Sequence, residues 1–151
     1  MMNGNYGLSA LIACVGFMGL AISTGVEASA PINFVAGQEW SIKSASPTTA
    51  KVIIGRVEPW RDKVSVSVSI VDIPIPQSDP GAGGVTQIAH IPFDKTALAA
   101  SVDRLLSDHA SPAPQFENGY EQWKSAKGGI FTISVEKAIE VMFQTVNRGR
   151  G

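Results

Sequence analysis

The stretch KVSVSVSIVDIPIP, residues 63–76, decides which fold the sequence predicts. Aliphatic side chains and serines alternate in it: Val64, Ser65, Val66, Ser67, Val68, Ser69 and Ile70. A period of two sustained over this length is typical of a β-strand with one buried face and one polar face. Such strands belong to antiparallel sheets that are covered on one side. The serines then form either a solvated face or a surface beside which a partner strand could lie.

The end of this stretch is irregular. The alternation changes frame at Ile70 and Val71, which predicts a β-bulge or a sharp twist there. Pro74 and Pro76 have no backbone N–H to donate to a neighbouring strand. The strand therefore ends at these prolines, or this part of it lies at a sheet edge.

Three further segments before residue 94 have the character of strands: 39–43, 51–57 and 85–93. The turn EPWRD, residues 58–62, joins the second of them to the serine-bearing strand. The segment QSDPGAGG, residues 77–84, is rich in turn-forming residues and predicts a loop.

Helical patterns follow these strands. Asp94 is typical of an N-cap, and it precedes a predicted helix over residues 95–109. The apolar stripe of this helix consists of Leu98, Val102, Leu105 and Leu106. A second helix is predicted over residues 115–127, after the SPAP segment. We interpret its aromatic stripe as a core face that contains Phe116, Tyr120 and Trp123.

A fifth strand over residues 130–133 and a last helix capped by Ser134 complete the prediction. Because strands precede most of the helices, the class is α+β. We expect an antiparallel meander sheet of about five strands, with the helices packed on one face. The predicted organisation has four parts: a signal peptide over 1–28, an arm over 29–37, a single domain over 38–147 and a disordered tail over 148–151.

The first 28 residues resemble a secretory signal peptide. Leu8 to Ile22 carry no charge, small residues follow, and cleavage is predicted after Ala28. A cut after Ala30 is less favourable because Pro31 would adjoin the scissile bond. The start lacks Lys and Arg, and the uncharged run extends to Val26, so an uncleaved membrane anchor is the alternative.

The single cysteine, Cys14, lies within this apolar run. The sequence LIAC resembles a bacterial lipoprotein box, but apolar residues continue beyond it, so we interpret Cys14 as a small apolar residue of the signal helix. Cleavage would remove it and exclude disulfide and thiol chemistry from the mature domain. Export without disulfides is compatible with a bacterial periplasm, so the predicted localisation is periplasmic or secreted.

Charge and motifs exclude several function classes. The chain has 12 Lys and Arg against 13 Asp and Glu, without a basic block, which argues against nucleic acid as a partner. The sequence contains no metal-ligand spacing and no P-loop, so no metal and no cofactor are predicted. A membrane is a partner only if the N-terminal segment stays uncleaved.

The turn EPWRD carries the preferred binding candidates. Trp60 and Arg61 lie at a predicted hairpin tip, and Arg56 lies on the strand that leads to it. Trp and Arg are the residues most enriched in the hot spots of protein interfaces. The alternative interpretation is that Trp60 folds back over the strands.

His90 and Asp94 form the alternative site, because a pair near a strand end could perform acid–base chemistry. We prefer structural roles for them, since Asp94 is the predicted helix cap and no nucleophile motif accompanies the pair. The sequence thus predicts an exported bacterial envelope protein that is not an enzyme and binds another envelope protein as an inhibitor or accessory module. The alternative is a small-ligand-binding protein or a hydrolase with a pocket near His90 and Asp94.

Overall fold

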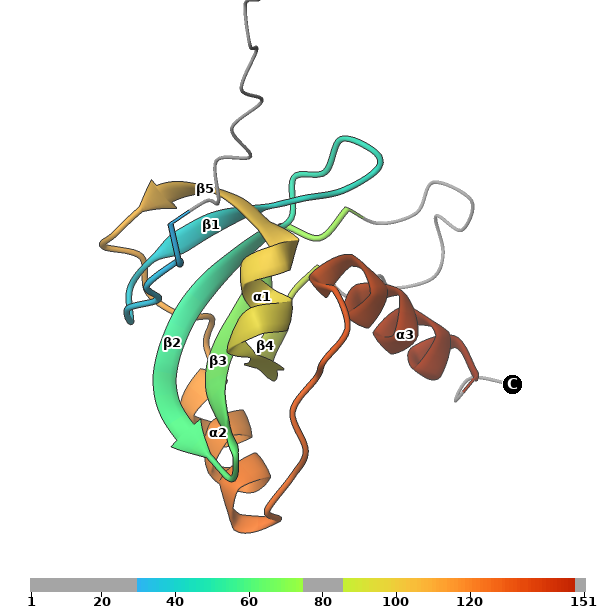
Figure 1. The fold of residues 1–151 in the computed structure, drawn as a ribbon. Coiled ribbons are helices and arrows are strands. Elements are labelled where there is room, and N and C mark those ends of the chain that lie inside the picture. Colours follow the sequence, from blue (N-terminus) through green and yellow to red (C-terminus); the bar gives the residue numbers. More distant parts are fainter. Residues whose placement is uncertain (1–29, 75–85, 149–151) are drawn as a thin grey trace, which may run out of the picture. The chain divides into compact units, whose positions relative to one another are not determined.

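A computed structural model describes residues 30–74 and 86–148 of the chain (Figure 1). The domain lies within a compact unit that spans Pro31–Gly151. Its elements, in chain order, are β1 (Glu39–Ile42), β2 (Lys51–Trp60), β3 (Lys63–Val71), β4 (Ile88–Asp94), α1 (Lys95–Ser101), β5 (Val102–Ser107), α2 (Phe116–Ser125) and α3 (Val135–Arg148). The predicted signal peptide and its cleavage site lie outside the described residues.

The strands form one five-stranded sheet in the order β4-β3-β2-β1-β5, and every pair is antiparallel. β1 to β4 follow each other as a meander, and β5 returns to the free side of β1. The structure therefore confirms the α+β class and the antiparallel sheet. The β2–β3 pair continues to Trp60 and Lys63, so the turn is shorter than predicted and consists of Arg61 and Asp62.

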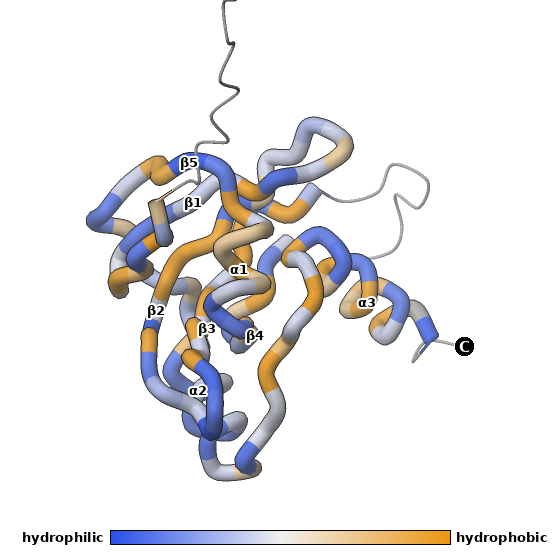
Figure 2. The backbone as a smooth tube through the Cα atoms, viewed as in Figure 1, coloured by the Kyte–Doolittle hydropathy of each residue, from blue (hydrophilic) through white to orange (hydrophobic). Residues whose placement is uncertain are grey.

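The register shows which side chains share a face. Val68 lies opposite Ile54 and Ile91, whereas the adjacent Ser67 lies opposite Arg56 and Pro92. A register shift between Val68 and Ile70 in the β3–β4 pair marks an irregularity slightly before the predicted bulge. The hydropathy of β2 changes from hydrophobic to hydrophilic along its length (Figure 2). This change coincides with the register shift between Ile54 and Arg56.

The face that carries Val66, Val68 and Ile70 holds the main hydrophobic core. The helices contribute Leu98 of α1 and Val135 and Ala138 of α3 to this core: the cluster also contains Phe34, Trp40, Ile42, Val52, Ile54, Ile88, Ile91, Phe93 and Val102. α1 contacts β3, β4 and α3. This part of the structure matches the apolar face predicted from the alternation.

The serine face is buried as well, which the sequence interpretation missed. Ser65, Ser67 and Ser69 are all at most 1% exposed, so they form no solvated surface. α2 contacts β3 and β4, and residue Ala113 donates its N–H to Ser69 Oγ at 2.9 Å. The helices thus lie on both faces of the sheet, not on one as expected, because the second helix folds back over the serines (Figure 1).

The predicted helix over 95–109 is wrong in its second half. Asp94 caps α1 as expected, and its Oδ2 accepts from the N–H groups of Thr96 and Ala97. The helix ends at Ser101, and the chain continues as β5, which pairs with β1. Ser101 Oγ donates to Ala97 O and accepts from Val135 N, and so joins the end of α1 to the start of α3.

The predicted strand over 130–133 is reduced to one bridge, in which Phe131 pairs in parallel with Phe93. Phe131 donates its N–H to Pro92 O and accepts from Asp94 N, and α3 begins at Val135, which leaves a short segment between this bridge and the helix. Ser134 Oγ accepts from Lys137 N at 3.2 Å, which fits its predicted role as the cap of α3. α3 includes Arg148, the first residue of the predicted tail, and the other tail residues lie outside the described part.

Candidate functional site

The preferred binding candidate, Trp60, is folded back onto the domain. Its ring stacks on Trp123 of α2 with centroids 4.2 Å apart, and the side chain is half-buried. The ring of His90 lies 5.7 Å from Trp123, 5.4 Å from Phe116 and 5.9 Å from Tyr120. We call these five residues the aromatic layer. They fill the space between α2 and the serine face of the sheet.

The two arginines near the tip also have partners within the domain. Arg61 donates to the carbonyl of Lys127 at 3.1 Å. Arg56 donates to Glu117 at 2.7 Å, and its guanidinium lies 4.5 Å from the centroid of the Tyr120 ring. The structure therefore brings Trp60, Arg61 and Arg56 to α2 and its C-terminal turn, where each connects the β2–β3 hairpin to the helix.

A polar network closes the edge of the aromatic layer. The Tyr120 hydroxyl donates to the Glu58 carboxylate, whose oxygens lie 2.9 and 3.0 Å away. Lys124 Nζ donates to the same hydroxyl at 2.7 Å and to Glu58 at 3.2 Å. These two bonds raise the pKa of Lys124, the bond to Tyr120 most strongly. Although the network contains a carboxylate, a phenol and an amine, its members satisfy each other's hydrogen bonds.

Two glycines make this close packing possible. A Cβ on Gly55 would lie 2.1 Å from the end of the Phe116 ring, and a Cβ on Gly119 would lie 2.7 Å from the Cβ of His90. Real Cβ atoms do not approach other heavy atoms so closely, so any larger residue would push α2 away from the sheet. The helix and the sheet are thus in direct contact, with no groove between them at these points.

His90 lies within hydrogen-bond distance of Ser67, a residue 23 positions away in the sequence. Its Nε2 lies 3.1 Å from Ser67 Oγ, the arrangement in which a histidine can activate a serine nucleophile. Ser67 is only 1% exposed beneath α2, so a substrate has no access to its hydroxyl. Burial lowers the pKa of His90 below its ordinary value of 6.5, and the nearby Glu117 opposes this shift. The neutral imidazole therefore suits a packed interior position.

Asp94, the other half of the alternative site, is engaged elsewhere. Its side chain caps α1, and one of its oxygens lies 4.0 Å from Lys63 Nζ. The hydrogen bonds of His90 and Asp94 go to different partners. The structure thus gives each residue a separate structural contact.

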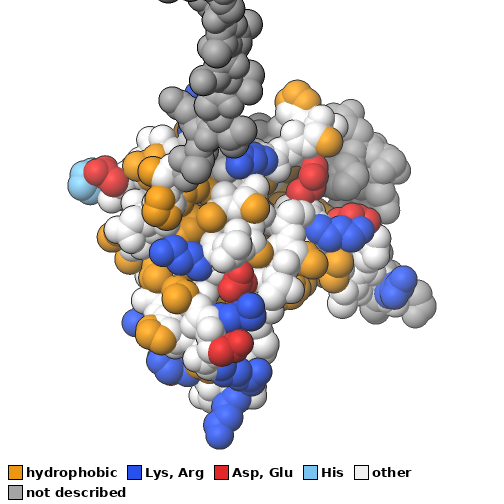
Figure 3. Space-filling view, in the orientation of Figure 1, with side chains coloured by type: hydrophobic (Ala, Val, Ile, Leu, Met, Phe, Trp, Pro, Cys, Tyr) orange, Lys and Arg blue, Asp and Glu red, His pale blue; other side chains and the backbone are white. Residues whose placement is uncertain are grey.

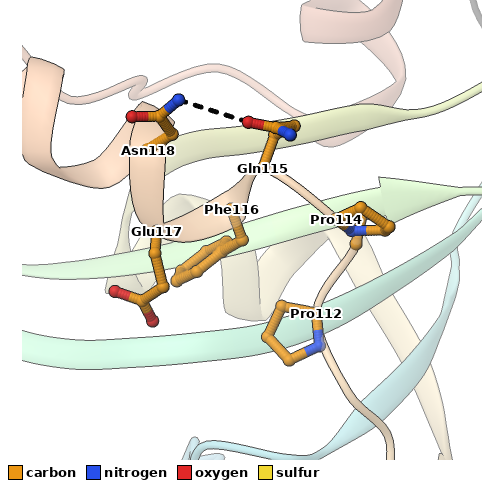
Figure 4. Close-up of a pocket in the computed structure, with 7 residues that line it drawn as sticks. Pro112, Pro114, Gln115, Phe116, Glu117 and Asn118 are labelled. Atoms are coloured by element: carbon orange, nitrogen blue, oxygen red, sulfur yellow. Dashed lines mark hydrogen bonds between the residues drawn. The ribbon is translucent and has the colours of Figure 1, made fainter.

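The cavities at the surface of the described domain are open and shallow. A depression of about 570 Å³ follows residues 112–118, where Gln115 accepts a hydrogen bond from Asn118 and Phe116 lies beneath the helix start (Figure 4). Other depressions lie around the 44–50 loop and involve Arg104, Leu106 or α3, but neither His90 nor Asp94 lines any of these cavities. Within residues 30–74 and 86–148, no group of three His, Cys, Asp or Glu side chains could hold a metal ion.

The outer strand β5 carries two apolar side chains, Leu105 and Leu106, that the other described residues leave about half exposed. Among the exposed large hydrophobic residues of the described chain, the three highest fractions belong to Val35 at 51%, Leu105 at 47% and Leu106 at 45%. Leu105 pairs with Trp40, on which Phe34, the neighbour of Val35, packs edge to face. We call Val35, Leu105 and Leu106 the β5 patch. Hydrophobic side chains are visible on this side of the molecule (Figure 3).

The helices in the described part of the chain are too short or too polar to span a membrane. A comparison of the chain with protein-family models, with curated proteins and with solved structures found no match. The function is therefore argued from the geometry of the domain.

Proposed function

We propose that the chain is an exported protein-binding module of the bacterial envelope and that the β5 patch is its binding surface. The observation that carries this proposal is the exposure of Val35, Leu105 and Leu106 at one edge of the sheet. Large apolar side chains that stay exposed beside one strand edge are candidates for burial against a partner. A β-strand edge also offers backbone hydrogen bonds to a partner.

This proposal moves the binding surface away from the hairpin tip. Trp60, Arg61 and Arg56 already contact α2, and a partner that used them would have to break those contacts. Leu105 and Leu106 need no such rearrangement. Binding through the β5 patch therefore requires less free energy to break existing contacts than binding through the hairpin tip.

A non-enzymatic role is part of the proposal. Its support is the burial beneath α2 of the Ser67–His90 pair, in which a histidine nitrogen lies within hydrogen-bond distance of a serine hydroxyl. A hydrolase would need a serine that its substrate can reach. The alternative of a ligand pocket near His90 and Asp94 has no comparable support, since Asp94 caps α1.

The envelope localisation rests on the sequence of residues 1–28. It is tested by fractionating cells that produce the C-terminally tagged chain and by sequencing the N-terminus of the recovered protein. The proposal expects a periplasmic or secreted chain that begins at Ser29. A chain recovered intact in the membrane fraction would instead favour the uncleaved anchor.

The binding surface is tested by a crosslinked pull-down from native cell envelopes, with all captured peptides identified by mass spectrometry. The variant Leu105→Glu places a charge within the β5 patch. The matched control Val57→Glu places the same charge on another exposed apolar residue, on β2, which β1 separates from β5. The proposal expects the wild-type chain and the control to capture the same protein and Leu105→Glu to lose it. Equal capture by all three chains would contradict it, provided that both variants keep the wild-type thermal midpoint.

A further inference from the structure

α2 and the main hydrophobic core have no residue in common. The buried helical residues of that core are Leu98 of α1 and Val135 and Ala138 of α3, and none of its members lies on α2. α2 instead contacts β3 and β4 from the opposite face, through the aromatic layer. The sheet, α1 and α3 can therefore stay folded while α2 moves away from the serines.

Both ends of α2 have a backbone conformation that is costly for a residue with a Cβ. Gln115, directly before the helix, has a φ of 72°, and Lys127, two residues after it, has a φ of 49°. These values lie in the left-handed region, where residues other than glycine are uncommon. Strained residues of this kind often occur in segments that move. A change of φ at these two positions would move the helix as a unit.

The closed position of α2 leaves two buried polar groups without partners. The indole N–H of Trp60 and the hydroxyl of Ser65 have no hydrogen-bond partner within the described residues. Both would bond to water if α2 moved away from the sheet. Their unmet hydrogen bonds therefore offset part of the free energy that the packing of the aromatic layer contributes to closure.

His90 is the titratable group at the centre of this contact. Its ring lies among the rings of Phe116, Tyr120 and Trp123, all of which belong to α2. An imidazolium at this position would lose much of its hydration, because aromatic rings surround it on the side of the helix.

The charges that flank the aromatic layer do not compensate for this loss. They form three pairs of opposite charge: Arg56 with Glu117, Lys124 with Glu58, and Lys63 with Asp94. Each carboxylate thus already has a cation as its partner. Glu117 raises the pKa of His90, but burial lowers it more strongly.

We propose that α2 is a hinged cover that opens in acid, because protonation of His90 releases the helix from the serine face while the rest of the domain stays folded. Water solvates the imidazolium in the open form, so protons bind the open form more tightly and shift the equilibrium toward it. This shift begins as the pH falls below 6.5, the ordinary pKa of histidine. In the acid-opened form the imidazolium cannot accept a proton from Ser67, so opening does not create a hydrolase.

Thiol accessibility tests the cover. Ser65→Cys places a thiol on the face under α2 and removes no hydrogen bond within the described residues. Val66→Cys is the matched control, because Val66 is fully buried in the main core on the other face. Both variants also carry Cys14→Ser, since Cys14 is the single cysteine of the chain. Labelling with dithiodipyridine is measured from about pH 7 to about pH 5, and each rate is divided by that of the same chain unfolded in urea at the same pH.

We expect the normalised rate of Ser65→Cys to rise on the order of tenfold between about pH 7 and about pH 5. Val66→Cys should react at least about tenfold more slowly at each pH, because only global unfolding exposes it. Adding His90→Gln to Ser65→Cys should abolish the rise. Equal rates for the two thiols would overturn the cover, and a rate for Ser65→Cys that does not depend on pH, or a rise that persists with His90→Gln, would overturn the role of His90.

Hydrogen exchange of the unsubstituted chain measures the same equilibrium if the cysteine variants fail to fold. After correction for intrinsic exchange, the amides of α2 should be less protected than those of β3, and their protection should fall in acid. Equal protection of the two elements would overturn the cover. The inference goes beyond the proposed function and uses none of the β5 patch, so the outcome of the pull-down with Leu105→Glu is independent of it.

Discussion

The face of the sheet under α1 and α3 is filled by aliphatic side chains, whereas the face under α2 is filled by serines, a histidine and aromatic rings. The first face excludes water through the volume of its side chains. On the second, small serines and Gly55 bring the backbone of β2 and β3 close to the rings of α2. Hydrogen bonds satisfy the hydroxyls of Ser67 and Ser69, whereas Ser65 Oγ and the indole N–H of Trp60 are buried with no hydrogen-bond partner within the described residues. A polar face of a strand is therefore not evidence of a solvated or binding surface.

The apolar face should be the more sensitive of the two. Phe93 is fully buried there and packs against Phe131 with ring centroids 5.9 Å apart. Phe93→Ala is expected to lower the free energy of unfolding by about 3–5 kcal/mol, because it leaves a cavity in a rigid core. Urea denaturation measures this loss. A loss below about 1 kcal/mol would show that the core is not rigid and that this face collapses around the cavity.

The second face is tested by adding one methyl group. Gly119→Ala directs a Cβ at His90, and the expected loss is about 1–2 kcal/mol, since overpacking outweighs the better helix propensity of alanine. Gly129→Ala is the matched control, because a Cβ at this position would meet no heavy atom within 4 Å beyond its chain neighbours. Equal stability of both variants in thermal and urea unfolding would mean that α2 does not pack closely on the sheet.

The polar network of Glu58, Tyr120 and Lys124 should contribute less to the free energy of unfolding. Tyr120→Phe removes the hydroxyl that donates to Glu58 and accepts from Lys124 and is expected to cost about 1 kcal/mol. Glu117→Gln, which weakens the exposed ion pair with Arg56, should cost less than about 0.5 kcal/mol. If Glu117→Gln lowers the free energy of unfolding in urea more than Tyr120→Phe does, the main contact of α2 lies at Glu117.

His90 on the second face should make the free energy of unfolding slightly dependent on pH. Because burial lowers the pKa of His90 in the folded state, protonation favours the unfolded chain. The stabilising effect of the neutral ring is complete above pH 6.5 and is lost as the pH falls from there through the lower folded pKa. His90→Gln should remove this dependence, whereas His109→Gln should keep it, since His109 is largely exposed. Identical pH profiles of the free energy of unfolding for both variants would contradict this role of His90.

The sequence predicted the parts of the fold that local patterns determine. The alternation in residues 63–70 defined β3 and its two faces, Asp94 defined the start of α1, and the glycines after residue 127 defined the end of α2. It failed at Val102 to Ser107, because Leu98, Val102, Leu105 and Leu106 fit a helical stripe. Pairing with β1, a contact distant in sequence, selects the strand.

The candidate site was harder to predict for the same reason. Nothing local to Trp60 shows that Trp123 lies 4.2 Å from it, and nothing near Ser67 shows that a helix covers it. The aromatic stripe of α2 was correctly interpreted as a core face, but its position on the serine side was missed. The exposure of Leu105 and Leu106 follows from the strand that replaced the predicted helix.

Trp60 decides whether the hairpin tip belongs to the second buried face or to a binding surface. The measurement is the free energy of unfolding of Trp60→Ala in urea, with Trp60→Phe as the control, because the indole N–H has no hydrogen-bond partner within the described residues. If Trp60 packs within the second face, we expect a loss of about 2 kcal/mol for Trp60→Ala and a clearly smaller loss for Trp60→Phe. An unchanged unfolding midpoint for Trp60→Ala would contradict it and return the binding role to the tip.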